Sequence, residues 1–183
     1  MTNFFQRVTN AIAIAATLVC VVTPAHATLL DGKTVRLEHD FPAPGNNIAS
    51  VDAVVGSGVE WATGYAGIYN VDVSDKTLSI TFLNNGGTWN TCCSFNGFHL
   101  IDIGNTISDF TSVYLSSSNF SFPSSGVTFD ANNIYVNFGS FGNTPADGTI
   151  NLDINGSNVP EPASIGLISL ALLGLGLSRR KQA

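Results

Sequence analysis

Charged residues are few in this chain, and basic residues are the scarcest of them. The 183 residues hold 13 aspartates and glutamates against 7 lysines and arginines. Between residues 28 and 158 there are three basic residues and twelve acidic ones, a net charge of −9. Nucleic acids and anionic lipid surfaces attract basic proteins. We therefore expect neither of them as a partner of this segment.

Sequence signatures of catalysis are also missing. The chain has no nucleophile elbow, no phosphate-binding glycine loop and no zinc-ligand spacing. Residues 28–158 contain two histidines, His39 and His99. His39 stands between Glu38 and Asp40, but neighbours on a strand point to opposite faces and do not form a base-orienting pair. We therefore expect a protein that is not an enzyme.

Helical periodicity is absent from the middle of the chain, where apolar residues recur at every second position instead. Turn-forming glycine, asparagine, serine and proline residues separate these short segments, and sixteen aromatic residues supply material for a core. The pattern predicts one all-β domain over residues 28–158, an antiparallel β-sandwich with a jelly roll as the candidate topology. The alternating or apolar segments are 35–37, 48–55, 69–73, 77–83, 98–103, 112–116, 132–141 and 149–154.

The N-terminus has the composition of a secretory signal peptide. Arg7 is followed by an uncharged apolar run, and Ala25 and Ala27 form the small-residue pair of a cleavage site. We expect cleavage after Ala27, which makes residues 1–27 a signal peptide and removes Cys20 with it. An uncleaved anchor helix is the alternative, but the apolar run is short for a membrane span.

The C-terminus combines a proline pair, a short apolar stretch and a basic tip. Residues 163–178 carry no charge. As a helix they extend ~24 Å, against ~30 Å for the hydrocarbon core of a bilayer. Arg179, Arg180 and Lys181 follow directly, and basic residues remain on the cytoplasmic side. The stretch therefore predicts a marginal transmembrane helix with a membrane stop at its end.

These parts in this order resemble the PEP-CTERM sorting signal. The resemblance rests on Val159, Pro160, Glu161 and Pro162, then the apolar stretch, then the basic tip, and it covers residues 159–183. It implies recognition and removal of the tail by an exosortase in Gram-negative bacteria that make exopolysaccharide. Residues 28–158 resemble only uncharacterised proteins that carry this signal.

The resulting functional prediction is an exported, exosortase-processed protein of the cell surface or extracellular matrix, non-catalytic and associated with exopolysaccharide in a biofilm matrix. Its expected partners during export are signal peptidase and exosortase, with the inner membrane engaged transiently through the C-terminal helix. Two alternatives remain open. One is a secreted carbohydrate-active enzyme on a jelly roll, and the other is a structural envelope protein that keeps its tail as a permanent anchor.

Aromatic residues near glycines and asparagines are the candidate sugar contacts. Trp61 and Tyr65 lie in a glycine-containing segment, and Trp89 lies in the polar loop NNGGTWNTCC. Aromatic rings stack on the apolar faces of sugars, although most aromatic residues of a small sandwich belong to its core. We expect Trp89 to be exposed and Tyr69 to be buried.

Adjacent cysteines and scattered carboxylates complete the candidates. Cys92 and Cys93 are predicted to form a vicinal disulfide, with free thiols or intermolecular cross-links as alternatives. Loop carboxylates suit calcium, but no calcium-binding motif is present, so we predict no metal and no cofactor. The carboxylates considered are Asp72, Asp75, Asp102, Asp109, Asp130, Asp147 and Asp153.

Overall fold

Alternation of apolar and polar residues determines which faces of the strands are buried. In β5 (Thr77–Phe82), Leu78, Ile80 and Phe82 are fully buried, and the residues between them are partly exposed. The same alternation buries one face of β10 (Asn133–Asn137) and of β12 (Thr149–Gly156). Each strand thus has an apolar face that a second layer must cover.

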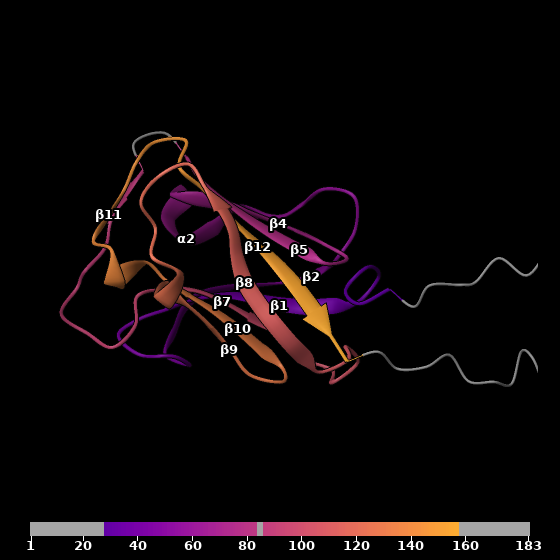
Figure 1. The fold of residues 1–183 in the computed structure, drawn as a ribbon. Helices are drawn as coiled ribbons and strands as arrows, with labels where there is room; N and C mark the ends of the chain where they lie inside the picture. Colours follow the sequence, from indigo (N-terminus) through magenta and orange to yellow (C-terminus); the bar gives the residue numbers. More distant parts are fainter. Residues whose placement is uncertain (1–27, 84–85, 158–183) are drawn as a thin grey trace, which may run out of the picture.

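The structure, a computed structural model, describes residues 28–83 and 86–157 and places their strands in two five-stranded antiparallel sheets that lie face to face (Figure 1). The first sheet has the order β2 (Asn47–Val54), β1 (Thr34–Asp40), β7 (Gly97–Ile101), β10, β9 (Val127–Phe129). The second has the order β3 (Val59–Thr63), β4 (Tyr69–Ser74), β5, β12, β8 (Phe110–Ser118). A small ribbon pairs β6 (Gly87–Thr88) with β11 (Asn143–Thr144).

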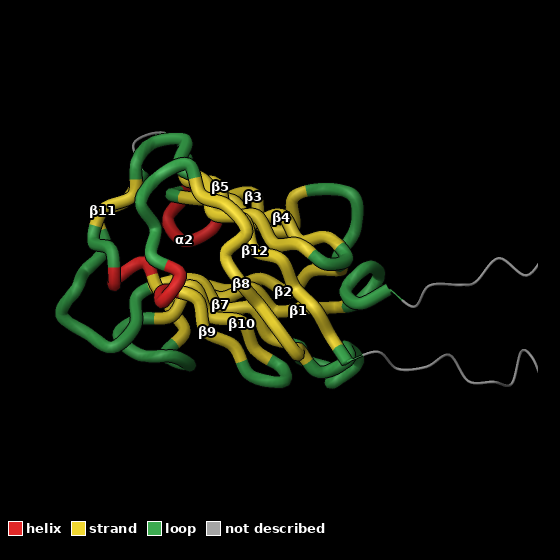
Figure 2. Tube along the Cα trace, in the orientation of Figure 1, coloured by secondary structure: helices red, strands yellow, loops and turns green. Residues whose placement is uncertain are grey.

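Helical structure is limited to short turns within the described residues. These are α2 (Gly64–Gly67) and the 3-10 turns Ser124–Gly126 and Phe138–Ser140. Figure 2 shows them in red at the end of the sandwich away from the first and last described residues. None of the helices in these residues has the length and apolar character needed to cross a membrane.

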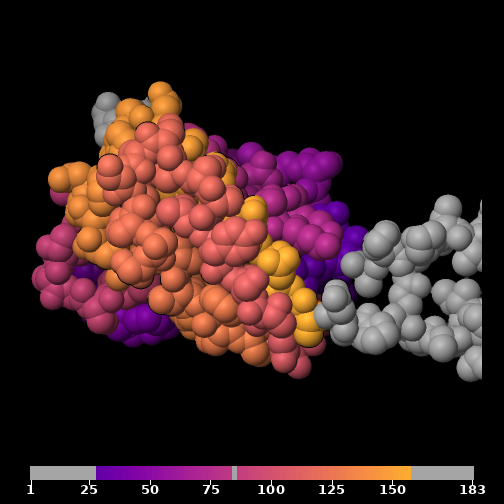
Figure 3. Space-filling view, in the orientation of Figure 1, coloured from indigo at the N-terminus to yellow at the C-terminus, as the bar shows by residue number. Residues whose placement is uncertain are grey.

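The core fills the space between the two sheets. Its largest fully buried side chains are aromatic: Tyr69, Phe82, Phe98 and Phe138. Tyr69, Phe82 and Phe138 pack edge to face, with ring centroids 5.1 Å apart for Phe82 and Phe138 and 5.4 Å apart for Tyr69 and Phe138. In the space-filling view, segments after residue 100 cover much of the visible face (Figure 3).

The two ends of the described chain lie together at one end of the sandwich, which we call the terminal end. A side chain at Gly156 would collide with Leu29, and Asp75 accepts hydrogen bonds from the backbone of Leu29 and Leu30. Strand β12 begins at the far end and runs to the terminal end (Figure 1).

The structure confirms the predicted antiparallel β-sandwich. The pairings β1–β2, β3–β4, β4–β5 and β9–β10 join strands that are consecutive in the chain, an arrangement of hairpins and a meander. This differs from the 4-1-2-3 strand order of a Greek key, from which a jelly roll is built. The predicted signal peptide and the predicted C-terminal helix lie outside the described residues.

Candidate functional site

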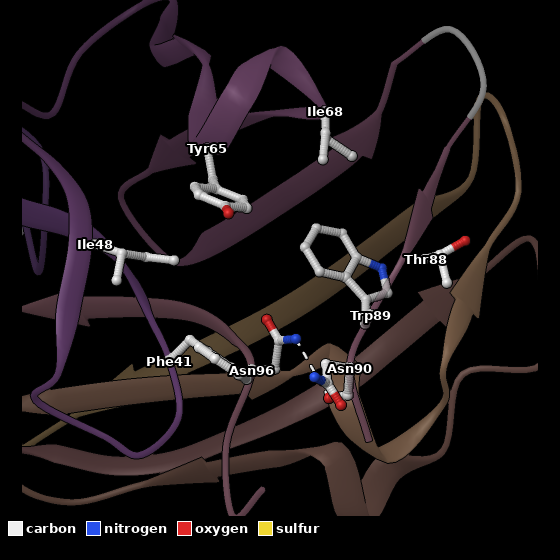
Figure 4. Close-up of a pocket in the computed structure, with 8 residues that line it drawn as sticks. All are labelled: Phe41, Ile48, Tyr65, Ile68, Thr88, Trp89, Asn90 and Asn96. Atoms are coloured by element: carbon white, nitrogen blue, oxygen red, sulfur yellow. Dashed lines mark hydrogen bonds between the residues drawn. The ribbon is translucent and has the colours of Figure 1, made fainter. Parts of the chain in front are cut away.

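A pocket near α2 and the β6–β11 ribbon combines aromatic, aliphatic and amide side chains. Its volume is about 240 Å³. In Figure 4, Tyr65 and Ile68 lie on one side of the pocket, and Asn90 and Asn96 lie across from them. The lining residues are Phe41, Ile48, Tyr65, Ile68, Thr88, Trp89, Asn90 and Asn96.

Both sheets contribute residues to this pocket, because the residues lie at strand ends and in a connection between strands. Phe41 follows β1 and Asn96 precedes β7, and these strands pair in register so that Asp40 lies opposite Gly97. The pairing brings Phe41 and Asn96 together from distant parts of the sequence. Tyr65 comes from α2, which connects β3 to β4 in the other sheet. The lining therefore exists only when the two sheets are packed.

Trp89 is buried, so the prediction that it is an exposed ring is wrong. Its side chain is 4 % exposed, and its indole N–H donates to the Thr144 hydroxyl at 3.0 Å. Thr144 lies in β11 beside β6, so a residue far along the chain satisfies the only polar group of the ring. The ring packs against Phe138, with centroids 4.8 Å apart. Trp89 meets the pocket as part of its wall.

Tyr65 presents its ring to the pocket and rests on a buried histidine. Its ring is partly exposed and stacks on His39, with centroids 4.3 Å apart and an interplanar angle of 12°. Of the three aromatic residues predicted to contact sugar, Tyr65 and Trp89 line the pocket together. Trp61 is 9 % exposed and packs edge to face on Tyr69, outside the pocket lining.

His39 is held in one tautomer beneath the pocket. Its Nε2 lies 3.0 Å from Asn96 Oδ1, and its Nδ1 lies 3.0 Å from the Tyr69 hydroxyl. Since an amide oxygen only accepts, the Nε2–H donates to Asn96 and the Tyr69 O–H donates to Nδ1. This is the arrangement of the neutral ring, which carries its one proton on Nε2.

Burial favours the neutral forms of both side chains in this contact. It lowers the pKa of His39 to about 4, mainly because the charged ring would be desolvated. Burial likewise raises the pKa of Tyr69 well above its usual value near 10. The inner wall of the pocket is therefore uncharged at neutral pH.

The polar groups at the pocket are the amides of Asn90 and Asn96, the hydroxyls of Thr88 and Tyr65, and the Trp89 indole. The Asn96 amide N–H donates to the Asn90 carbonyl at 3.3 Å, which ties together the segments before and after the cysteine pair (Figure 4). Asn90 and Thr88 are exposed. Amide and hydroxyl groups of this kind form hydrogen bonds with neutral polar ligands.

The cysteine pair lies in the loop that follows Asn90. Cys92 and Cys93 are joined by a disulfide, with their Cα atoms 3.8 Å apart. The Cys92 backbone N–H donates to Asn90 Oδ1 at 3.0 Å. This hydrogen bond links the disulfide directly to Asn90, a residue of the pocket lining.

Three of the carboxylates considered for calcium accept backbone hydrogen bonds. Asp75 accepts from Leu29 and Leu30, and Asp130 accepts from Asn132 at 2.9 Å. Asp102 accepts from the three backbone N–H groups of residues 104, 106 and 107. These side chains close turns and fix the N-terminal segment.

A cluster outside the pocket was missed by the sequence reasoning, which considered only His39 beside Glu38 and Asp40. The partner of these two carboxylates is His99 in β7. Its Nδ1 lies 2.8 Å from Asp40 Oδ2 and 3.9 Å from Glu38 Oε2. The spacing Glu38-x-Asp40 was the available signal, since residues two apart on a strand share a face.

Comparison with known proteins identifies one segment of the chain. Residues 158–181 match the PEP-CTERM protein-sorting motif, which confirms the sorting signal predicted from the sequence. No curated protein and no solved structure matches the chain.

The matched motif gives the general destination of the protein. The chain is an exported protein that is processed by an exosortase, and it is located at the cell surface or outside the cell.

Proposed function

We propose that the β-sandwich is a non-catalytic module that binds exopolysaccharide at the pocket lined by Tyr65 and Trp89. The observation that carries the proposal is the lining itself. Aromatic and aliphatic walls surround amide and hydroxyl groups, and the side chains of Tyr65 and Phe41 are partly exposed. Sugars have the same combination of apolar faces and hydroxyl rims.

The charges of the site and of the domain favour a neutral or N-acetylated sugar. None of the eight lining residues is charged, and the residues from 28 to 158 have a net charge of −9. An acidic polysaccharide would meet repulsion from this domain and no compensating cation in the lining. A neutral chain needs only stacking and hydrogen bonds, and this pocket offers both.

The same lining favours binding over cleavage. Hydrolysis of a glycosidic bond generally requires two carboxyl groups flanking the bond. The polar lining groups here come from Thr88, Asn90 and Asn96, together with the Tyr65 hydroxyl and the Trp89 indole. These groups hold a ligand by hydrogen bonds. The alternative of a carbohydrate-active enzyme therefore lacks a matching acid–base pair at this pocket.

The experiment is a pull-down of purified exopolysaccharide from the host by the exported protein and by Tyr65→Ala. Loss of one stacked ring costs ~1 kcal/mol or more. We expect the variant to bind about five- to tenfold more weakly. Tyr114→Ala is the matched control, because Tyr114 is 51 % exposed on β8 and lies outside the pocket lining.

Two results would contradict the proposal. If Tyr65→Ala and Tyr114→Ala both bind as well as the parent, the pocket is not the binding site. If the protein releases new reducing ends from the polysaccharide, the enzyme alternative replaces the binding module.

A further inference from the structure

Strand pairing assembles three potential metal ligands on the outer face of the first sheet. Glu38 and Asp40 are two residues apart on β1, and their side chains therefore share a face. In the antiparallel register between β1 and β7, Glu38 lies directly opposite His99. The register between β7 and β10 places Tyr135 opposite His99 on the other side of β7. A single face of three neighbouring strands thus brings the cluster together.

The cluster is compact and shielded from solvent. One ligand atom from each of Glu38, Asp40 and His99 lies within 4.8 Å of the other two. The three residues are 7 %, 0 % and 4 % exposed, respectively. The Tyr135 ring stacks on His99 with centroids 4.3 Å apart. Gly45 approaches from the loop after β1 and donates its N–H to Asp40 Oδ2 at 2.7 Å.

The protein groups around the cluster do not balance its charge or its hydrogen-bonding capacity. Asp40 Oδ2 has partners, but Oδ1 of the same buried carboxylate has none. Arg36 comes no nearer to Glu38 than 4.0 Å, and Asp52 binds its guanidinium at 2.6 and 2.9 Å. Two buried carboxylates therefore face a single imidazole. Because Asp52 and Glu38 share Arg36, even a protonated His99 leaves three carboxylates with two cations, and an uncompensated charge is costly to bury.

Asn133 fixes the orientation of the His99 ring through Nε2, the ring nitrogen remote from the carboxylates. Its Nε2 lies 3.0 Å from Asn133 Oδ1, and the Asn133 amide N–H donates to Asp130 Oδ1 at 2.8 Å. Because the amide oxygen accepts, Nε2 carries a proton and donates it. Metal-binding histidines are held in this way, with the remote ring nitrogen donating to a fixed acceptor. Nδ1 is thereby the ring nitrogen that faces the carboxylates.

From these observations we propose that Glu38, Asp40 and His99 bind a divalent transition-metal ion, with Zn²⁺ as the best fit. One imidazole nitrogen and two carboxylate oxygens are ligands that zinc accepts. Ligand atoms around tetrahedral zinc are about 3.3 Å apart, given bonds of ~2.0–2.1 Å. The distances of 2.8 and 3.9 Å from His99 Nδ1 to the two carboxylates lie on either side of that value.

The ion would compensate the excess negative charge of the cluster and the missing hydrogen-bond partner of Asp40 Oδ1. A charge of +2 neutralises two carboxylates when His99 is a neutral ligand, and the ion supplies a partner for the carboxylate of Asp40. Calcium and magnesium prefer sites made of oxygen atoms alone, so the imidazole favours zinc over both. The low exposure of the ligands indicates a structural role, in which the ion fastens β1 to β7.

The test uses the exported protein, purified with an affinity tag that contains no histidine and kept oxidised so that Cys92 and Cys93 cannot supply thiolates. After treatment with a chelator and dialysis, Zn²⁺, Ca²⁺ and Mg²⁺ are added separately. Calorimetry and elemental analysis then give the affinity and the number of bound ions. We expect one equivalent of Zn²⁺, with a Kd of about 1 µM or tighter. Saturation with Zn²⁺ should raise Tm by about 5–10 °C.

Glu38→Gln is the informative variant, because it removes a ligand charge while keeping the size of the side chain. Among the described residues the Glu38 side chain makes no hydrogen bond, and its ionic contacts are His99 at 3.9 Å and Arg36 at 4.0 Å, so the metal-free variant should melt within a few degrees of the parent. We expect its affinity for Zn²⁺ to fall at least about tenfold. Asp72→Asn removes an exposed carboxylate from the second sheet and should bind Zn²⁺ like the parent.

The proposal is wrong if the parent protein takes up no Zn²⁺ under these conditions. It is equally wrong if Glu38→Gln retains the parent affinity, or if Ca²⁺ or Mg²⁺ binds in preference to Zn²⁺. Circular dichroism of each variant shows that the sandwich has formed before its metal content is measured.

Discussion

At the scale of single residues, His39 is the clearest case of a side chain controlled by burial. It is fully buried, and Asn96 and Tyr69 occupy its two ring nitrogens in the neutral tautomer. Its pKa is lowered to about 4, against about 6.5 for a histidine in an unfolded chain. Protonation of this ring therefore opposes folding.

Stability should accordingly fall as the pH is lowered from 6.5 to 4. In that window the unfolded chain takes up a proton at His39 and the folded protein does not, so the unfolded state is favoured. The shift corresponds to a loss of about 3 kcal/mol. In His39→Gln this part of the pH dependence disappears. The stability of the variant relative to the parent should therefore improve by about 3 kcal/mol between pH 7 and pH 4.

Urea denaturation of both proteins at several pH values measures this difference. Carboxylates also titrate near pH 4, but they are common to both proteins and cancel in the comparison. A stability difference that is the same at pH 7 and at pH 4 would show that His39 is not the titrating group.

Trp89 gives a second prediction at the residue scale. Its burial against Phe138 and its hydrogen bond to Thr144 mean that Trp89→Ala leaves a large cavity and removes one of the hydrogen bonds of the Thr144 hydroxyl. We expect the free energy of unfolding to fall by ~3–5 kcal/mol.

Thermal denaturation of Trp89→Ala and Trp89→Phe checks the role of this side chain. The phenylalanine variant keeps most of the ring volume and loses the N–H donor, so its Tm should lie between those of the parent and the alanine variant. An alanine variant with the parental Tm would restore the view of Trp89 as a surface residue.

At the scale of elements, sequence alone predicts which segments are strands but does not predict their partners. The alternation of apolar and polar residues over 77–83 and 149–154 can be read within each segment alone, and both segments form strands in the structure. By contrast, β3, β9 and the β6–β11 ribbon are short and have little periodicity, so no local pattern marked them. Pairing between β1 and β7 depends on packing between segments far apart in the chain.

The same distinction explains what could be predicted of the site. Tyr65 was a candidate from its glycine-rich surroundings, and it does line the pocket. The burial of Trp89 could not be inferred from its polar neighbours, because Thr144 and Phe138, which enclose it, follow some fifty residues later. The contact between His99 and Asp40 likewise appears only once β1 and β7 are in register.

The sorting segment is the element whose role was predicted most fully from sequence. Replacing Pro160, Glu161 and Pro162 by alanine removes the Pro-Glu-Pro motif, including two prolines that disfavour a continuous helix. We expect a full-length precursor to accumulate in the membrane fraction of the host, detected by mass spectrometry of its C-terminus.

Neutral replacements at Arg179, Arg180 and Lys181 provide the comparison. They should weaken the stop at the membrane, because basic residues hold the tip on the cytoplasmic side. If the alanine variant is processed like the parent, the tail serves as a plain anchor.

At the scale of the whole molecule, the two candidate sites differ in position and in chemistry. The pocket near α2 has an uncharged lining that draws on both sheets. The cluster of Glu38, Asp40 and His99 lies on the outer face of the first sheet and carries the charge that the pocket lacks. A metal ion that links β1 to β7 would also restrict the motion of Phe41 and Asn96, because these residues adjoin the ends of the two strands.

The course of β12 has a mechanical consequence. This strand runs from the far end of the sandwich to the terminal end, where Gly156 leads towards the sorting segment, and it is hydrogen-bonded to β5 on one side and to β8 on the other. Tension between a matrix polymer held near α2 and an attachment at the C-terminus would pull along the axis of β12. Its hydrogen bonds lie perpendicular to that axis, so they would be sheared together and would not open one at a time. If the proposed function holds, the strands beside β12 would therefore resist a load along its axis by shear.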